Sequence, residues 1–225
     1  TLPHFNEAMK KQQISFDVYP YVAGSTILRS DMLERADKVL ITWSDKVPGM
    51  SGRDLKEIAE EMGCSMKEAA DRIQPAGAIY FMMDEKDVQA AMSHPGAMIG
   101  SDGIPFDAHP HPRLWGTFPR VLGHYSRDLG LFPLEDAVRR MTSYSAQRFH
   151  LTHRGEVKPG FYADLCVFDP ATVIDTATFE KPISPARGID TVICNGAFAW
   201  RDGKPGGGQA GRALNRQAMQ VEAKA

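Results

Sequence analysis

The chain has few cysteines, and their scarcity excludes one class of small protein. Only Cys64, Cys166 and Cys194 occur among the 225 residues, and no two of them have zinc-ribbon spacing. An odd, scattered set of cysteines does not form a disulfide framework, and it is typical of proteins from a reducing compartment. We therefore expect a cytoplasmic protein that is not stabilised by disulfide bonds.

Long apolar runs and an excess of one charge are also missing. No stretch approaches the ~18 apolar residues that a membrane-spanning helix needs, and Thr1 is not followed by the apolar core of a signal peptide. The 26 Lys and Arg residues against 28 Asp and Glu residues give a formal net charge of -2, whereas nucleic-acid-binding proteins usually carry a basic excess. We expect a soluble protein whose partners include neither a membrane nor a nucleic acid.

Common catalytic signatures are absent as well. The sequence has no P-loop, and the glycines at 206–208 follow no predicted strand and open no helix. No serine lies in a Gly-x-Ser-x-Gly elbow. Five of the seven histidines are scattered without metal-ligand spacing, namely His4, His94, His124, His150 and His153.

Up to about residue 150 the pattern alternates strands and helices. Strands are expected at residues 14–18, 39–43, 78–83 and 97–100. Helices are expected after the capping-box pairs Ser51/Asp54 and Ser65/Glu68, at 84–92, and from Pro133 onward. The polar stretch after Tyr21 is expected to be a loop. The strand, helix and strand between 78 and 100 predict parallel pairing of those two strands.

After about residue 150 the pattern becomes all-β. Strands are expected at 163–168 and 189–194, and Asn195-Gly196 between apolar runs is a strong hairpin signal. Asp202-Gly203 predicts a further turn. The rest, residues 205–225, is glycine-rich and polar, so we expect a flexible tail there.

Asp102 is the first candidate catalytic residue. It lies in Ile-Gly-Ser-Asp-Gly, directly after a predicted buried strand, and α/β enzymes place catalytic groups at the carboxyl ends of such strands. Ser-Asp-Gly is also an ordinary turn tripeptide, so this segment alone leaves a purely structural aspartate open.

Two further groups of polar residues accompany it. His109, His111 and Arg113 follow in a proline-stiffened loop; His-x-His can bind a metal, but the alternating prolines favour roles in the loop or in contacting substrate. Tyr19-Pro20-Tyr21 and Gly24-Ser25-Thr26 follow the strand at 14–18, and a tyrosine and two hydroxyls at a strand end could bind a substrate carboxylate. A tyrosine packed in the core with its hydroxyl at the rim is the alternative.

Together these segments resemble the N-acyl-D-amino acid deacylases (D-aminoacylases) of the amidohydrolase superfamily. The resemblance covers most of the chain, and its most specific blocks are Asp-Val-Tyr-Pro-Tyr at 17–21 and Gly-Thr-Phe-Pro-Arg at 116–120. The remaining matching segments are 24–26, 99–103, 111–113, 154–160, 163–165 and 167–170.

The resemblance implies an α/β fold in two parts. Residues 1–150 would be the C-terminal part of a (β/α)8, TIM-like barrel of a metal-dependent hydrolase, with a lid insertion at about 23–77. Residues 151–204 would be the C-terminal strands of a small β-sandwich domain. Because the chain starts at Thr1 and soon reaches a buried strand, we expect the C-terminal portion of a longer enzyme, inactive by itself.

The resemblance also implies a function, the hydrolysis of the amide bond of N-acyl-D-amino acids with zinc as cofactor. Asp102 would be general base and metal ligand, with the other ligands upstream of this chain, since none of the three cysteines matches the family's metal-binding cysteine. Tyr19, Ser25 and Arg113 would bind the small-molecule substrate. The alternatives are another cyclic or linear amide hydrolase of the superfamily, or a non-catalytic remnant that acts as an interaction module.

Overall fold

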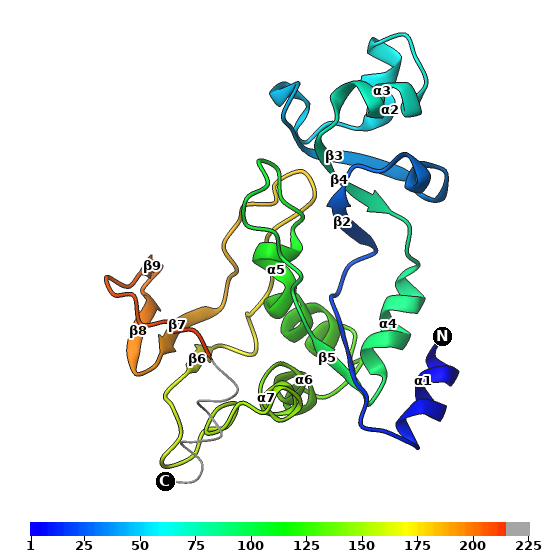
Figure 1. Ribbon diagram of the computed structural model, residues 1–225. Helices are drawn as coiled ribbons and strands as arrows, with labels where there is room; N and C mark the ends of the chain where they lie inside the picture. The colour runs from blue at the N-terminus through cyan, green and yellow to red at the C-terminus, as the bar shows by residue number, and fades with distance from the viewer. Residues whose placement is uncertain (215–225) are drawn as a thin grey trace.

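A computed structural model of the protein describes residues 1–214 and contains three separate sheets (Figure 1). A parallel pair is formed by β1 (Phe16–Val18) and β5 (Ala97–Ile99). An antiparallel sheet has the order β2 (Ala23–Ile27), β4 (Ala76–Phe81) and β3 (Lys38–Ser44). A second antiparallel sheet runs β6 (Leu165–Phe168), β7 (Ile189–Cys194), β8 (Ala197–Arg201) and β9 (Lys204–Pro205). The α/β expectation for the first part of the chain is confirmed.

The parallel pair is connected through α4 (Glu85–Ser93), which begins at the predicted cap Asp84. The prediction that the strand at 78–83 pairs in parallel with the next strand is wrong. That strand is β4, and it pairs antiparallel with β2 and β3, whereas β5 pairs with β1. The crossover helix thus belongs to β1 and β5, and the second sheet is inserted between β1 and that helix.

The inserted part has its own apolar core. The helices α2 (Leu55–Glu61) and α3 (Met66–Ile73) pack on the sheet through fully buried side chains such as Leu55, Ile58 and Ile73. Two short 3-10 helices, η1 (Ser30–Arg35) and η2 (Pro48–Met50), complete it. The loop predicted after Tyr21 is wrong, because residues 23–27 form β2. Ala23 and Gly24 have little strand propensity, but β4 supplies backbone partners along the whole segment.

Of the two capping boxes predicted in the inserted part, the structure has one. The capping box at Ser65 and Glu68 is confirmed, since the Ser65 hydroxyl accepts from the Glu68 amide and the Glu68 carboxylate accepts from the Ser65 amide. Ser51 does not cap α2. Asp54 is the N-cap, and its carboxylate accepts from the Lys56 amide at 2.9 Å.

Helices surround β5 after the loop at 101–112. Pro133 precedes α6 (Leu134–Met141), as predicted, and α7 (Ser143–Phe149) follows it. A helix that the pattern did not predict, α5 (Arg113–Arg120), continues into the π-helix η3 (Val121–Asp128). Glycine and proline usually weaken or break a helix, so the sequence pattern around Gly116 and Pro119 did not indicate α5. The short helix α1 (Leu2–Met9) lies at the N-terminal end.

The all-β expectation for the C-terminal part is confirmed for the four-stranded sheet. Asn195 and Gly196 have φ of 47° and 82°, which is the backbone of a tight hairpin turn. The β-sandwich and the domain boundaries stay predictions. Ala210 lies in the predicted tail, and its carbonyl accepts a hydrogen bond from Asn195 Nδ2 at 2.6 Å. Residues 215–225 of that tail lie outside the described residues. Of the helices in residues 1–214, none is long and apolar enough to cross a membrane.

The capping arrangement predicts how three substitutions change stability. Ser65→Ala and Asp54→Ala should each lower the free energy of unfolding by about 1 kcal/mol, because each removes the side chain that caps a helix. Ser51→Ala is the matched control and should have little effect. Urea unfolding measures all three, and an equal loss in Ser51→Ala would contradict the assignment.

Candidate active site

Asp102 lies where the chain leaves β5, three residues after Ile99. Its φ of 47° is in the left-handed region, which costs a residue with a β-carbon about 1 kcal/mol or more and is concentrated at functional sites. The side chain is 63% exposed, and its Oδ2 is 2.7 Å from Nη2 of Arg113. Asp102 therefore presents a carboxylate to solvent while an ion pair fixes its orientation.

Arg113 is the first residue of α5, and its side chain is only 1% exposed. Besides the ion pair with Asp102, Nη2 donates to the Ser25 carbonyl at 3.2 Å. Its Nε and Nη1 are buried and have no hydrogen-bond partner within residues 1–214. Buried donors on a charged group cost free energy when they stay unpaired. This guanidinium therefore has capacity for a further anionic group.

Tyr19 and Ser25 border the same guanidinium. The Tyr19 ring lies 4.6 Å from Cζ of Arg113, and burial raises the pKa of the Tyr19 hydroxyl, although the Arg113 charge opposes this. The Ser25 hydroxyl is buried and also has no partner among the described residues. Asp102, Tyr19 and Ser25 thus meet around the buried guanidinium of Arg113, the fourth residue that the resemblance singles out. Hydroxyl and guanidinium donors together are suited to a carboxylate.

The two loop histidines have structural roles. His111 Nε2 is 2.9 Å from the Ala23 carbonyl, and its Nδ1 accepts from the Arg113 amide at 3.0 Å, which makes the ring neutral with its proton on Nε2. Burial lowers the His111 pKa to about 3, and the Arg113 charge adds to this. His109 Nε2 is 2.7 Å from the Phe179 carbonyl. Both rings join the loop to other segments.

Metal ligands are few in the part of the chain that the structure describes. No three His, Cys, Asp or Glu side chains gather there as a metal site would require. The three cysteines are free: Cys166 lies in β6, Cys194 in β7, and Cys64 between α2 and α3. Residues 1–214 therefore do not form a complete metal site, and Asp102 is the one ligand that they are proposed to supply.

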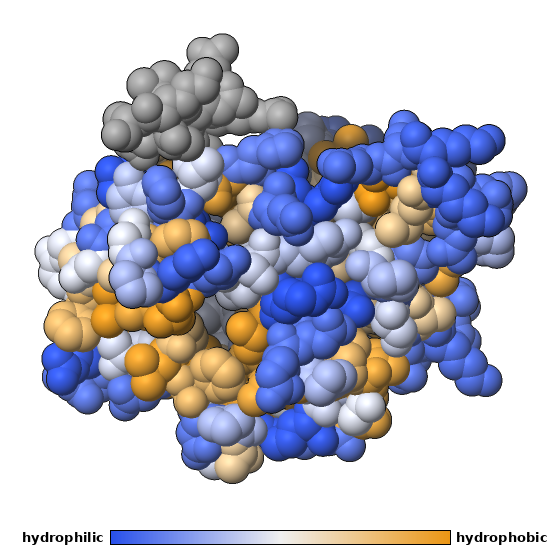
Figure 2. All heavy atoms as spheres, turned by 90° about the horizontal axis from the view of Figure 1, so that it is seen from below, coloured by the Kyte–Doolittle hydropathy of each residue, from blue (hydrophilic) through white to orange (hydrophobic). Residues whose placement is uncertain are grey.

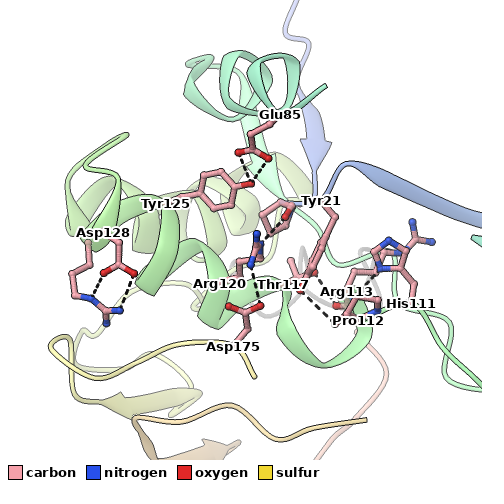
Figure 3. A network of polar contacts seen from close by, with 12 residues as sticks. Tyr21, Glu85, His111, Pro112, Arg113, Thr117, Arg120, Tyr125, Asp128 and Asp175 are labelled. Carbon is pink, nitrogen blue, oxygen red and sulfur yellow. Dashed lines mark hydrogen bonds and ion pairs between the residues drawn. The ribbon is translucent and has the colours of Figure 1, made fainter. Parts of the chain in front are cut away.

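A polar network that no sequence pattern predicted lies beside these residues (Figure 3). Arg120, at the end of α5, lies between Tyr21 and Tyr125 and makes an ion pair with Asp175. The Tyr125 hydroxyl donates to Glu85 at 2.9 Å. Arg120 stands in the Gly-Thr-Phe-Pro-Arg block, which was the available signal, but Asp175 lies in an irregular segment that carried none.

Comparisons with known proteins agree over most of the chain. The profile of the amidohydrolase family matches residues 11–199. D-aminoacylase of Alcaligenes xylosoxydans xylosoxydans is 57% identical over 97% of this chain and 45% of its own length. The N-acyl-D-glutamate deacylase of the same organism is 46% identical over 91% of this chain and 42% of its own. The chain thus spans less than half the length of these relatives.

Solved structures give the same picture. A structure of D-aminoacylase, in work on its binuclear metal center, matches with a TM-score of 0.93 and 59% identity, covering 96% of this chain and 45% of that one. N-acyl-D-glutamate deacylase from Bordetella bronchiseptica, complexed with zinc and a phosphonate inhibitor, matches with a TM-score of 0.88 and 46% identity. This match covers 92% of this chain and 44% of that one.

The neutral state of His111 predicts how stability depends on pH. The unfolded chain binds a proton at His111 below about pH 6.5, but the folded protein resists this until about pH 3. The stability that neutral His111 contributes is therefore complete above pH 6.5 and is lost as the pH falls toward 3, by at most about 1.4 kcal/mol per pH unit.

Urea unfolding between pH 7 and pH 5 measures this dependence. Wild type should lose more stability than His111→Gln as the pH falls, and His150→Gln, at an exposed position, is the control for removing a histidine. Parallel pH curves for wild type and His111→Gln would show that the imidazole is not held neutral by the fold.

Proposed function

The chain belongs to the amidohydrolase family, and from this premise we propose that its protein hydrolyses the amide bond of N-acyl-D-amino acids to a D-amino acid and a carboxylate. One observation carries the proposal: Asp102, Tyr19 and Ser25 surround the buried, partly unpaired guanidinium of Arg113. The D-aminoacylase and N-acyl-D-amino acid deacylase names of the relatives support the substrate class.

Substrate binding falls to Tyr19, Ser25 and Arg113. The α-carboxylate of an N-acyl-D-amino acid would accept hydrogen bonds from the hydroxyls of Tyr19 and Ser25, with the Arg113 charge beside it. A cyclic amide whose ring includes the α-carboxyl carbon has no such free carboxylate, so these donors favour a linear N-acyl-amino acid over that cyclic-amide alternative. The substrate is a small molecule in either case.

Proton transfer falls to Asp102. Its exposed carboxylate can accept a proton from the attacking water and return it to the leaving amine, because the same group serves as base and then as acid. The ion pair with Arg113 keeps the carboxylate in one orientation, which favours transfer along a fixed path.

Zinc is the proposed cofactor, with Asp102 as one ligand and the others from outside residues 1–214. The zinc complex of the glutamate deacylase and the binuclear center of D-aminoacylase support a metal in this family. A bound zinc ion lowers the pKa of its water toward ~7 and polarises the amide carbonyl. The non-catalytic alternative would leave Asp102 without this partner.

The proposed architecture is a (β/α)8 barrel to which β1, α4 and β5 contribute, with residues 23–77 as a lid. Within the described residues, β1 and β5 each have an unpaired outer edge, and such edges are normally covered by further strands. The inserted sheet stands apart from this pair in Figure 1, and apolar side chains are exposed on the face drawn in Figure 2. The unpaired edges of β1 and β5 support further strands beside the pair.

Asp102→Asn in the full-length protein should lower kcat by about 10²- to 10⁴-fold, because the amide cannot carry the proton. Asp202→Asn is the matched control, since Asp202 also has a left-handed backbone (φ 52°) and lies in a turn of the β sheet. Steady-state assays with paired N-acetyl-D- and N-acetyl-L-amino acids, with zinc analysis alongside, measure both variants. Near-normal turnover in Asp102→Asn would exclude the general-base role.

Tyr19→Phe should raise KM about tenfold or more for substrates with a free α-carboxylate, because one hydrogen bond to a charged group is lost. The comparison substrates are the corresponding N-acyl-D-amino acid amides, which lack that carboxylate. An unchanged KM, or an equal change for both substrate types, would reject the contact.

A further inference from the structure

Arg120 joins two segments that lie far apart in the sequence. Its Nε donates to the Pro20 carbonyl at 3.0 Å, and its Nη1 is 3.3 Å from Oδ2 of Asp175. The Cζ atom lies 5.2 Å from the centre of the Tyr21 ring and 5.7 Å from that of Tyr125 (Figure 3). A planar guanidinium can reach two acceptors in fixed directions, which a lysine cannot do.

Asp175 belongs to residues 171–188, which we call the crossing segment because they leave the sheet after β6 and return to it at β7. The Asp175 side chain is 7% exposed, and Arg120 is its ion-pair partner. Gly116 of α5 makes this approach possible. A β-carbon there would lie 2.5 Å from the Tyr21 hydroxyl and 3.1 Å from Cβ of Asp175.

The crossing segment also reaches the loop that follows Asp102. The Phe179 carbonyl is the partner of His109, and the Phe179 ring lies 5.0 Å from the His111 ring and 6.3 Å from that of Tyr21. In Figure 1 this part of the chain runs up beside the green loop at the top of α5. The segment thus contacts both stretches that carry the proposed substrate-binding residues.

Pro20 connects this arrangement to the proposed substrate-binding residues. It stands between Tyr19, whose ring stacks on Arg113, and Tyr21, whose ring lies 5.1 Å from His111. A fixed Pro20 carbonyl therefore restricts both tyrosines. We propose that Arg120 and Asp175 are positioning residues, through which the crossing segment holds Tyr19 over Arg113. The proposal rests on the function proposed above for Tyr19.

Arg127 offers a matched control from η3, the π-helix that continues α5. Its Nη1 donates to the Val173 carbonyl at 2.7 Å and to the Pro170 carbonyl at 3.4 Å, so it too fastens the crossing segment and the residues next to it. These hydrogen bonds are to the crossing segment and to Pro170, not to residues 19–21. Replacing Arg127 therefore removes only contacts that fix the crossing segment and Pro170. Replacing Arg120 removes the contact with Asp175 of that segment and also the hydrogen bond to the Pro20 carbonyl.

The experiment compares Arg120→Gln, Asp175→Asn and Arg127→Gln in the full-length protein. The first two should raise KM for N-acyl-D-amino acids about tenfold while kcat changes less than about threefold, the pattern of lost substrate binding. Arg127→Gln should leave both constants within about twofold. Amide hydrogen exchange over residues 18–23, which include the Tyr21 amide bonded to the Tyr19 carbonyl at 3.0 Å, should accelerate only in the first two variants.

Two results would overturn the proposal. One is unchanged exchange over residues 18–23 in both Arg120→Gln and Asp175→Asn; the other is an equal change in Arg127→Gln. Asp175→Asn keeps the shape of the side chain and carries the comparison if Arg120→Gln does not fold. If wild type does not hydrolyse N-acyl-D-amino acids, the proposed function fails, and the exchange measurement by itself still decides whether Arg120 and Asp175 position Tyr19.

Discussion

The buried charge of Arg113 is the constraint on which the candidate site depends. A guanidinium that is 1% exposed must be compensated by nearby acceptors and dipoles, because water no longer solvates it. Asp102 and the Ser25 carbonyl supply part of that compensation. The loop after β5, the middle of β2 and the first turn of α5 are therefore held together by one side chain.

Burial, with the same charge added to it, explains the state of the neighbouring imidazole. Burial penalises a protonated His111, and protonation would also place a second cation beside Arg113, so the ring remains neutral and can accept from the Arg113 amide. The inserted sheet provides the carbonyl of Ala23 on the other side of the ring. A histidine that resembles a metal ligand in the sequence thus serves as a spacer between the inserted sheet and α5.

Much of the local structure could be predicted because neighbouring residues decide it. Asn195-Gly196 forms its turn, Ser65 caps its helix, and Asp84 precedes α4, as their side chains and backbone preferences dictate. The failures have a different origin. The strand β2 exists because β4 pairs with it, and α5 persists through Gly116 and Pro119 because packing against Tyr21 and Asp175 outweighs propensity.

The sequence by itself carried the amidohydrolase resemblance, and that resemblance singled out Asp102, Tyr19, Ser25 and Arg113. Residue types and spacing alone showed a carboxylate after one predicted strand and hydroxyls after another, because such patterns are visible in one dimension. Only the tertiary structure decided that Asp102, Tyr19 and Ser25 surround the buried guanidinium of Arg113, that both loop histidines bond to carbonyls, and that Asp175 reaches Arg120. Those are long-range contacts, and burial and pairing of charge depend on neighbours that no local pattern specifies.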